Sequence, residues 1–298
     1  MVYHIPALLS ESIEGLNIRP DGIYVDATFG GGGHSMEILK RLKTGKLVAF
    51  DQDDDALVNV PDDGRFIFLN QNFRFLKNNL KFNGIEKIDG LIADLGVSFH
   101  QFDDPARGFT FRQDAPLDMR MNKNGKLTAA TMIQNMDEGE LADIFYNYGE
   151  LTNSRVIARK IVTARNTSMI LTADDLITSI AGLAPKRQEH KFLAKVFQAL
   201  RIAVNKEIDY LKEMLLQIPE ILRPGGRLVV LTYHSLEDRV IKNFMRTGNC
   251  EGVEKKDFYG NVETPFRILN KKGITPGMEE ISRNNRARSS RLRIAEKI

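Results

Sequence analysis

The sequence predicts an α/β fold in which helices cover a mostly parallel sheet and a helical subdomain interrupts that sheet. Short apolar runs alternate with helical patterns over about the first 95 residues, which is typical of a parallel sheet. About 130 residues then separate the fourth predicted strand from the fifth, whereas a compact βαβ connection needs loops of only ~2–6 residues around one helix. We therefore expect an insertion between these two strands.

The composition of the 298 residues limits the class of protein. Apolar residues make up 42% and charged residues 27%, which is ordinary for a globular chain and argues against disorder, collagen or coiled coil. No window approaches ~18 consecutive apolar residues, and residues 1–6 lack the basic region and apolar core of a secretory signal. The single Cys250 cannot form an internal disulfide. We expect a cytoplasmic protein without a membrane partner.

Five strands are predicted from short apolar runs bounded by turns or polar residues. They cover residues 23–26, 47–50, 66–69, 91–93 and 227–233, with helices over 35–41 and 73–82. Apolar residues that step by three or four from Leu200 to Leu222 predict one helix before the last strand. Pro219 should kink or break this helix near its end, and Pro224-Gly225-Gly226 should form a tight turn.

The inserted segment is predicted to be mainly helical. Helical patterns cover residues 138–148, 155–165, 173–183 and those from 191 onward. Residues 103–125 lack periodicity, which predicts a long loop of the kind that usually has a function. The predicted domains are residues 1–105 with 198–298, and an inserted loop and helical subdomain at 106–197 that we expect to recognise the substrate.

A glycine run follows the first predicted strand. Asp26 ends the strand, glycines occupy positions 30–33, and His34 opens the next helix. Glycines here let the backbone approach a ligand closely, so Gly30 joins Asp26 as a cofactor-binding candidate. An acid before the loop would repel the pyrophosphate of a nicotinamide cofactor. Because S-adenosylmethionine carries an ammonium, a sulfonium and no phosphate, the sequence favours that cofactor; a simple tight turn is the alternative.

An acid also ends the second predicted strand. Asp51 follows Asp26 at a distance close to the ~20-residue spacing with which Rossmann-like sheets place an acid on the ribose hydroxyls. Asp51 is therefore the candidate for the cofactor ribose. Asp53, Asp54 and Asp55 are better explained by helix capping and by contact with the helix dipole.

The fourth predicted strand ends in Asp94-Leu95-Gly96-Val97-Ser98. Open α/β sheets bind ligands at the carboxyl ends of their strands, so polar groups here would face both cofactor and substrate. Asp94 and Ser98 are the catalytic candidates, and Gln101 comes within reach if the loop turns back. The alternative is a capped helix start at Asp94 or Ser98.

His234, Ser235 and Arg239 follow the fifth predicted strand and are the candidates for binding the substrate. The alternative for this segment is a capping-box variant formed by Ser235 and Asp238. The phenylalanines at 99, 102, 109 and 111 could stack on a base, although phenylalanine is more often a core residue.

Two other chemistries lack support in the sequence. The five histidines show no ligand spacing and one cysteine cannot build a Cys-type zinc site, so no metal is expected. A Ser-His-Asp hydrolase is also disfavoured, because the G-x-S-x-G motif is absent from the sequence.

Basic residues are concentrated near the C-terminus. Residues 283–298 carry six Lys or Arg against Glu296, a balance of +5, while the whole chain is +3 and the rest therefore −2. This asymmetry suggests a polyanionic partner such as nucleic acid, with a solvated basic tail as the alternative. The candidates for contact with such a polyanion are Arg155, Arg159, Lys160 and Arg165 in the insertion and Arg286, Arg288, Arg291 and Arg293 in the tail. For Arg291 and Arg293, the alternative is a terminal strand packed on the sheet.

These motifs resemble those of the ribosomal RNA small subunit methyltransferase H family, the bacterial N(4)-cytosine methyltransferases. In chain order the matching segments are His4–Leu9, Asp26–Ser35, Asp94–Ser98, Arg107–Phe111, Pro116–Met121, Arg201–Asn205, Gly226–Arg239 and Asn285–Ser289. Phe99 and His100 stand where the family more often has a serine and a proline.

The resemblance implies a Rossmann-like, S-adenosylmethionine-dependent methyltransferase sheet with an inserted helical subdomain. The implied reaction methylates the exocyclic N(4) amine of a cytidine in small-subunit ribosomal RNA, near the decoding centre. The implied cofactor contacts are Gly32, Gly33, His34, Asp51, Phe73, Asp94 and Gln101.

Two competing functions are considered beside this one. A non-catalytic RNA-binding ribosome assembly factor would be expected to have lost Asp26, Asp51 or Asp94, and all three are present. An amino-methyltransferase acting on DNA would be expected to carry a D-P-P-[YFW] motif, which the sequence lacks.

Overall fold

The chain forms two compact units in a computed structural model that describes residues 6–298, with only the backbone described for 99 and 100. The sheet unit consists of Met1–Gly96 and Ile208–Ile298, and the helical unit consists of Val97–Glu207. The helical unit begins before and ends after the predicted range 106–197.

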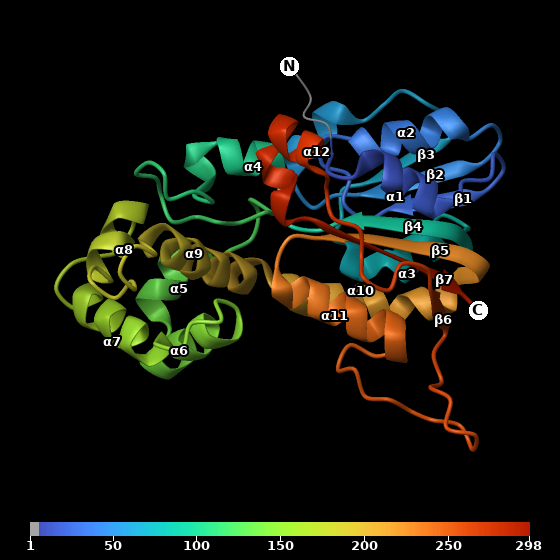
Figure 1. The fold of residues 1–298 in the computed structure, drawn as a ribbon. Helices are drawn as coiled ribbons and strands as arrows, with labels where there is room; N and C mark the ends of the chain where they lie inside the picture. The colour runs from blue at the N-terminus through green and yellow to red at the C-terminus, as the bar shows by residue number, and fades with distance from the viewer. Residues whose placement is uncertain (1–5) are drawn as a thin grey trace. The chain divides into compact units, whose positions relative to one another are not determined.

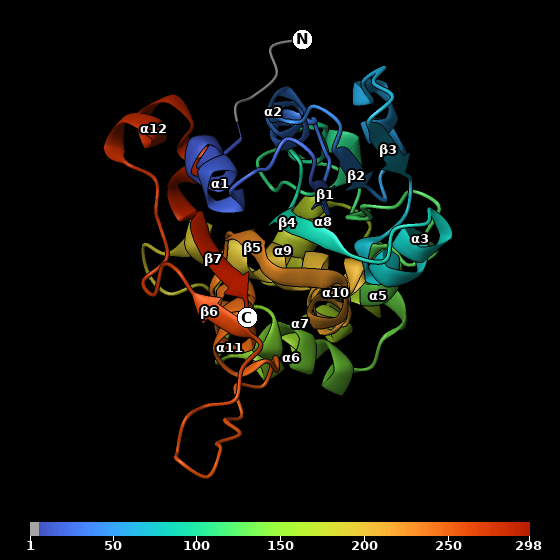
Figure 2. The same cartoon turned by 90° about the vertical axis from the view of Figure 1, so that its right-hand side faces the viewer.

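A seven-stranded sheet forms the centre of the sheet unit, in the order β3-β2-β1-β4-β5-β7-β6. The strands are β1 (Ile23–Asp26), β2 (Lys46–Phe50), β3 (Phe66–Leu69), β4 (Ile88–Asp94), β5 (Leu222–Thr232), β6 (Phe266–Ile268) and β7 (Arg291–Lys297). Strands β1 to β5 are parallel, whereas β7 is antiparallel to both of its neighbours. Figure 2 shows the strands in this order. The α/β fold and the five predicted strands are confirmed.

Helices cover both faces of this sheet (Figure 1). Helices α1 (Leu9–Leu16) and α2 (Gly33–Arg41) share a core with Tyr24, while α3 (Leu76–Phe82), α10 (Glu207–Ile221) and α11 (Ser235–Thr247) share another with Val25. Adjacent residues of β1 thus belong to opposite cores, as the alternation of side chains along a strand requires. The remaining helices of the unit are η1 (Asp54–Asn59), η2 (Phe73–Phe75), α12 (Met278–Arg283) and η4 (Asn285–Ser289).

The single helix predicted from Leu200 to Leu222 is wrong, because the chain forms two helices here. Helix α9 (Glu189–Asn205) ends at Lys206, which has a left-handed φ of 50°, and α10 begins at Glu207. The apolar periodicity continues across the break because each helix buries its own apolar face, α9 in the helical unit and α10 in the sheet unit. Pro219 lies inside α10, which ends two residues later at Ile221.

The predicted Pro224-Gly225-Gly226 turn lies within β5 as an irregularity in its pairing with β4. Ile88 pairs with Leu222 and Gly90 pairs with Arg227, so β5 contains extra residues between these two points. Gly225 has a φ of +80°, a conformation that glycine adopts without strain. Beyond this turn, β5 runs in register with β4 to Thr232.

The helical unit has its own apolar core. Its helices are α4 (Phe99–Asp103), η3 (Pro105–Arg107), α5 (Ala129–Asn135), α6 (Glu138–Asn147), α7 (Ser154–Arg165), α8 (Ala173–Ser179) and α9. Helix α8 is shorter than the predicted 173–183. Phe109 is buried in this core, and Phe102 and Phe111 pack against it, so base stacking by these three is not supported. The Phe99 side chain lies outside the described residues.

Among residues 6–298, no helix combines the length and the apolar character needed to cross a lipid bilayer.

Candidate active site at the carboxyl edge of the sheet

The glycine loop after β1 is held at both of its ends by Asp26. One carboxylate oxygen accepts a hydrogen bond from the Thr28 amide at 3.1 Å, and the other accepts one from Ser35 Oγ at 2.7 Å. The residue is only 1% exposed, and this burial raises the pKa of its carboxyl to about 6. Asp26 therefore stabilises the loop, and its predicted contact with a cofactor ammonium stays a prediction.

Two glycines of the loop meet demands that come from the protein itself. Gly32 has a φ of +77° and caps the start of α2. A Cβ atom on Gly33 would lie 2.4 Å from Cγ of Pro6, so only glycine lets the N-terminal segment pack here. Glycine at positions 32 and 33 is therefore explained by the packing of the protein itself, and the close approach of a ligand to Gly30, Gly32 and Gly33 stays a prediction.

Asp51 binds the same loop from the end of β2. Its carboxylate accepts hydrogen bonds from the amides of Gly30 at 2.7 Å and Asp53 at 2.9 Å. Each carboxylate oxygen can accept a further bond, which leaves capacity for the two hydroxyls of a ribose. Desolvation, with smaller contributions from the neighbouring Asp53 and Asp26 carboxylates, outweighs the hydrogen bonds from the Gly30 and Asp53 amides and raises the pKa of Asp51 to about 6.

Asp94 ends β4 between two hydroxyl side chains. Its amide donates to Thr28 Oγ1 at 2.6 Å, and Tyr233 donates its phenolic hydrogen to the Asp94 carboxylate at 2.7 Å. Desolvation raises the pKa of Asp94 to about 7, with smaller contributions from the charges of Asp26 and Glu237. The same surroundings raise the pKa of Tyr233 well above its usual value, so the phenol keeps its proton.

His34, the second residue of α2, points a ring nitrogen toward Asp94. Its Nδ1 lies 3.9 Å from the Asp94 carboxylate, and the side chain is almost fully buried. Burial lowers the pKa of His34 to about 4, so the ring is neutral near pH 7. Within the described part of the chain, its Nε2 is buried without a hydrogen-bond partner. A buried polar atom of this kind indicates a ligand or a water molecule that completes its bonding.

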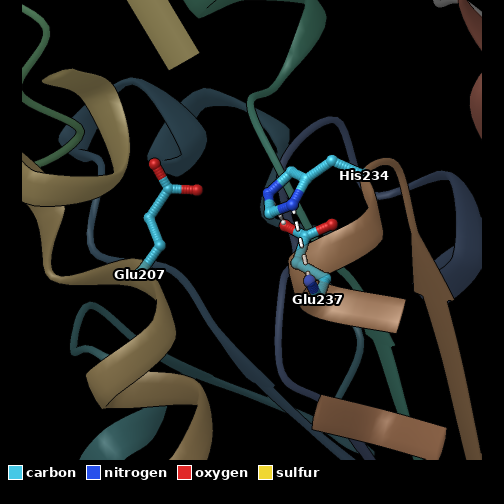
Figure 3. A group of neighbouring side chains, drawn as sticks. All are labelled: Glu207, His234 and Glu237. Carbon is cyan, nitrogen blue, oxygen red and sulfur yellow. Dashed lines mark hydrogen bonds and ion pairs between the residues drawn. The ribbon is translucent and has the colours of Figure 1, made fainter. Parts of the chain in front are cut away.

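His234 and Glu237 form the cap of α11 (Figure 3). The Glu237 amide donates to His234 Nδ1 at 3.4 Å, His234 Nε2 lies 3.1 Å from a Glu237 carboxylate oxygen, and the Tyr233 amide donates to Glu237 at 2.8 Å. The capping pair is therefore shifted by one residue from the predicted Ser235 and Asp238, because Ser235 is already the first helical residue. Ser235 and Arg239 are exposed at the start of the same helix.

Glu207, which Figure 3 also labels, belongs to the helical unit and is bound there by Arg201 at 2.9 Å. Within either unit by itself, the described residues contain no group of three His, Cys, Asp or Glu side chains placed to hold an ion. The expectation that the site uses no metal stays a prediction.

Ser98 and Gln101 cap the start of α4 in the helical unit. The Ser98 amide donates to Gln101 Oε1 at 3.1 Å, and the Gln101 amide donates to Ser98 Oγ at 3.2 Å. This reciprocal pair is the capped helix start considered as the alternative for Ser98. The catalytic role of Ser98 and the cofactor contact of Gln101 stay predictions. Phe73, at the start of η2, is partly buried against the main core of the sheet unit.

Three site residues were not predicted from the sequence: Thr28, Tyr233 and Glu237. Thr28 and Tyr233 lie inside segments that match the family's motifs, but they carry no charge that singles them out, and their role depends on how β1, β4 and β5 align. Glu237 is three residues after His234, the spacing of an N-cap and its N3 partner, so a capping search that included histidine could have found it.

The predicted RNA-contact arginines have several different environments. Both Arg291 and Arg293 lie in β7, as the terminal-strand alternative predicted. Arg293 is 5% exposed and is bound by Asp238, so the alternative replaces RNA contact for this residue, whereas Arg291 is only partly buried. In the insertion, Arg159 pairs with Glu138 at 3.4 Å, and Arg165 donates to the backbone oxygen of Ile133.

The fold and the site define a Rossmann-like methyltransferase. The sheet has a glycine loop after β1, acids at the ends of three parallel strands and an antiparallel strand beyond β5. The profile of the MraW methylase family matches residues 1–298, and the chain belongs to this family.

Proteins named ribosomal RNA small subunit methyltransferase H are similar to this chain over its length. The protein from Phocaeicola vulgatus is 57% identical over 297 residues, covering 99% of this chain and 98% of that protein. Those from Parabacteroides distasonis and Flavobacterium johnsoniae are 58% and 54% identical, covering 99% and 100% of this chain and 98% and 99% of theirs. A solved putative methyltransferase from Streptococcus mutans, in complex with SAH, is 13% identical with a TM-score of 0.42, over 99% of this chain and 100% of that one.

The methyl donor of this methyltransferase is S-adenosylmethionine, as the sequence predicted. The residues of the sheet unit fit this molecule. Asp26, Asp51 and Asp94 place three carboxyl groups at or directly after the ends of neighbouring strands, which suits a ligand with cationic groups. His34 Nε2 has no hydrogen-bond partner in the described chain, and the contacts of all four residues to the cofactor stay predictions. The chain is therefore an S-adenosylmethionine-dependent methyltransferase.

Proposed function

We propose that this protein methylates the exocyclic N(4) amine of a cytidine in small-subunit ribosomal RNA, near the decoding centre, in the cytoplasm. The relatives described above carry a name that assigns them to small-subunit ribosomal RNA, and the sequence motifs resemble those of N(4)-cytosine methyltransferases. The observation that carries the proposal is Asp94, a carboxyl with a pKa of about 7 at the end of β4, bound by Tyr233.

The cofactor supplies an electrophilic methyl group on its sulfonium sulfur. Asp51 would bind the ribose hydroxyls, and Asp26 and Asp94 would face the positive charges. Phe73 would flank the adenine. Gly30, Gly32, Gly33, His34 and Gln101 would complete the contacts to the cofactor.

The target nitrogen is a weak nucleophile because its lone pair is delocalised into the cytosine ring. The protein must therefore orient this nitrogen, and orientation can provide about 7–11 kcal/mol in favourable cases. An acceptor aimed at the amine stabilises the positive charge that develops on the nitrogen as its bond to the methyl carbon forms. Asp94 is that acceptor, and Ser98 assists it. Since the pKa of Asp94 is about 7, its carboxylate can also take the proton that the nitrogen loses.

The cytidine would be held by the segment that follows β5. His234 is fixed by Glu237, so its ring has one orientation, and Ser235 and Arg239 are exposed on the first turns of α11. These three residues are the proposed contacts to the nucleotide.

Incubation of the protein with labelled S-adenosylmethionine and undermethylated small ribosomal subunits, followed by nucleoside analysis, tests this function. Labelled N(4)-methylcytidine is the expected product. Label in another nucleoside would refute the N(4) assignment, and no label would favour a non-catalytic assembly factor. A parallel reaction with DNA tests the amino-methyltransferase alternative, and we expect no label there.

A further inference from the structure

An open hollow in the sheet unit is lined mainly by basic side chains. Its volume is about 610 Å³, and five of its seven lining residues are Lys or Arg: Lys242, Lys271, Lys272, Arg291 and Arg293. We propose that this cationic hollow binds the phosphodiester backbone of the ribosomal RNA substrate. The inference rests on the proposed function, because it assigns a surface to the same RNA.

The loop that carries Lys271 and Lys272 is fixed to β7 on both sides of the two lysines. Before them, the Asn270 side chain donates to the Leu292 carbonyl at 3.0 Å and accepts from the Ile294 amide at 2.8 Å. After them, the backbones of Ile274 and Leu292 exchange two hydrogen bonds of 2.9 Å. The two ammonium groups are thus presented by an ordered backbone, which reduces the entropy lost when a ligand binds.

Arg291 lies against the turn of this loop. Gly273 has a φ of +74°, and a Cβ atom there would lie 2.8 Å from Cγ of Arg291. The guanidinium of Arg291 donates to the Lys272 carbonyl at 3.3 Å. Glycine at 273 therefore lets the arginine stem pack on the turn, which places its charge beside the two lysines.

Little negative charge opposes these cations. Arg293 is neutralised by Asp238, with two hydrogen bonds of 2.6 and 2.8 Å. In the described chain, no carboxylate forms an ion pair with any of the other four. By contrast, Arg155 of the helical unit lines a hollow together with Glu138 and Asp143. The cationic hollow is therefore the more favourable site for a polyanion.

The position of the hollow connects it to the candidate active site within the same unit. In the antiparallel pair of β5 and β7, Arg291 lies opposite Thr232, the residue before Tyr233. Lys242 lies on α11, which begins two residues after Tyr233. RNA held here would pass close to the edge that carries Asp94. Phosphate contacts supply affinity without sequence information, which is what positioning a single cytidine requires.

The test compares two triple variants that remove equal charge. The hollow variant is Lys242→Gln/Lys271→Gln/Lys272→Gln. The control is Lys43→Gln/Lys46→Gln/Lys81→Gln, three exposed lysines of the sheet unit outside the hollow. Affinity for undermethylated small subunits, and for the deproteinised small-subunit RNA, is measured over a range of KCl concentrations. Calorimetry with S-adenosylmethionine checks that both variants are folded.

We expect the hollow variant to bind both probes at least about tenfold more weakly at low salt. Its plot of log affinity against log salt should be shallower by about 0.7–0.9 for each phosphate that the variant no longer neutralises. Its affinity for the cofactor should equal that of the wild type. The proposal would be overturned if the hollow variant bound both probes as tightly as the control variant does. It would also be overturned if the hollow variant bound subunits more weakly but bound the deproteinised RNA normally, because that result would indicate a ribosomal protein as the ligand. The proposed function is judged separately, by the nucleoside that the wild type methylates.

Discussion

The phenolic hydroxyl of Tyr233 donates its hydrogen to the carboxylate of Asp94 at 2.7 Å, joining the end of β5 to the end of β4. The bond stabilises the ionised form of Asp94 and opposes the desolvation that, on balance, raises the pKa of this carboxyl to about 7. Tyr233 thereby positions the carboxylate and adjusts the pH at which it can accept a proton.

The first prediction concerns Tyr233→Phe. Loss of a hydrogen bond to a charged group costs about 1.5–3 kcal/mol, which corresponds to roughly one to two pH units. We expect the pKa of Asp94 to rise, the single-turnover rate at neutral pH to fall about tenfold, and the rate to recover at higher pH. Tyr24→Phe, which loses a hydroxyl bonded to the Arg19 amide, is the matched control. A pH–rate profile equal to that of the control would exclude the positioning role.

The second prediction is that Asp94→Asn lowers turnover more than affinity for the cofactor. The amide keeps the shape and can still accept from Tyr233, but it takes no proton from the target nitrogen. Single-turnover methylation at saturating cofactor should be slowed by about two orders of magnitude. A wild-type rate constant would remove Asp94 from the chemistry.

The same variant should be more stable than the wild type in alkaline solution. The folded pKa of Asp94 is raised above 3.8, so its stabilising effect is complete below that value and is lost as the pH rises through about 7. Asp94→Asn should therefore melt at a higher temperature than the wild type at about pH 8 and lose most of this advantage at about pH 5. If the variant and the wild type melted at the same temperature at about pH 8, the conclusion that the Asp94 carboxylate is buried at a cost in stability would be wrong.

Most strands of the sheet could be predicted from the sequence, because a short apolar run between polar turns is typical of a buried strand in a parallel sheet. The break at Lys206 could not, since one apolar periodicity serves two separate cores on either side of it. Asp51 and Asp94 could be located because an acid at a strand end is visible in the sequence. Tyr233 could not, because its partner is 139 residues away and is set by strand order.

A third prediction concerns Asp51→Ala. Loss of charge-assisted hydrogen bonds of about 1.5–3 kcal/mol each should raise the dissociation constant for S-adenosylmethionine tenfold or more. Asp51 also binds the Gly30 and Asp53 amides, so part of the loss could come from the loop. Asp53→Ala, which removes a cap next to the site and keeps Asp51, is the comparison. Calorimetry that finds unchanged affinity in folded Asp51→Ala would refute the ribose contact.

The fourth prediction is a pH dependence of cofactor binding. The pKa values of Asp26 and Asp51 are raised to about 6 and that of Asp94 to about 7, so these groups become neutral as the pH falls through this range. A cationic ligand favours their ionised forms, so binding should release protons and weaken several-fold between about pH 8 and about pH 5.5. Calorimetry in buffers of different ionisation enthalpy measures the release. S-adenosylhomocysteine, which lacks the sulfonium charge, should show a smaller effect, and equal proton release for both ligands would contradict this explanation.

The last prediction concerns the helical unit. Arg155 and Lys160 are exposed on α7, but Arg159 is paired with Glu138, and Arg165 is bonded to the backbone of α5. Arg155→Gln/Lys160→Gln should therefore weaken binding to small subunits by only about threefold and reduce the salt slope by less than the cationic-hollow variant does. Affinity for the cofactor should not change. If this double variant lost more affinity and more salt slope than the hollow variant, the insertion would be the main RNA-docking surface and the charge balance argued for the two surfaces would be wrong.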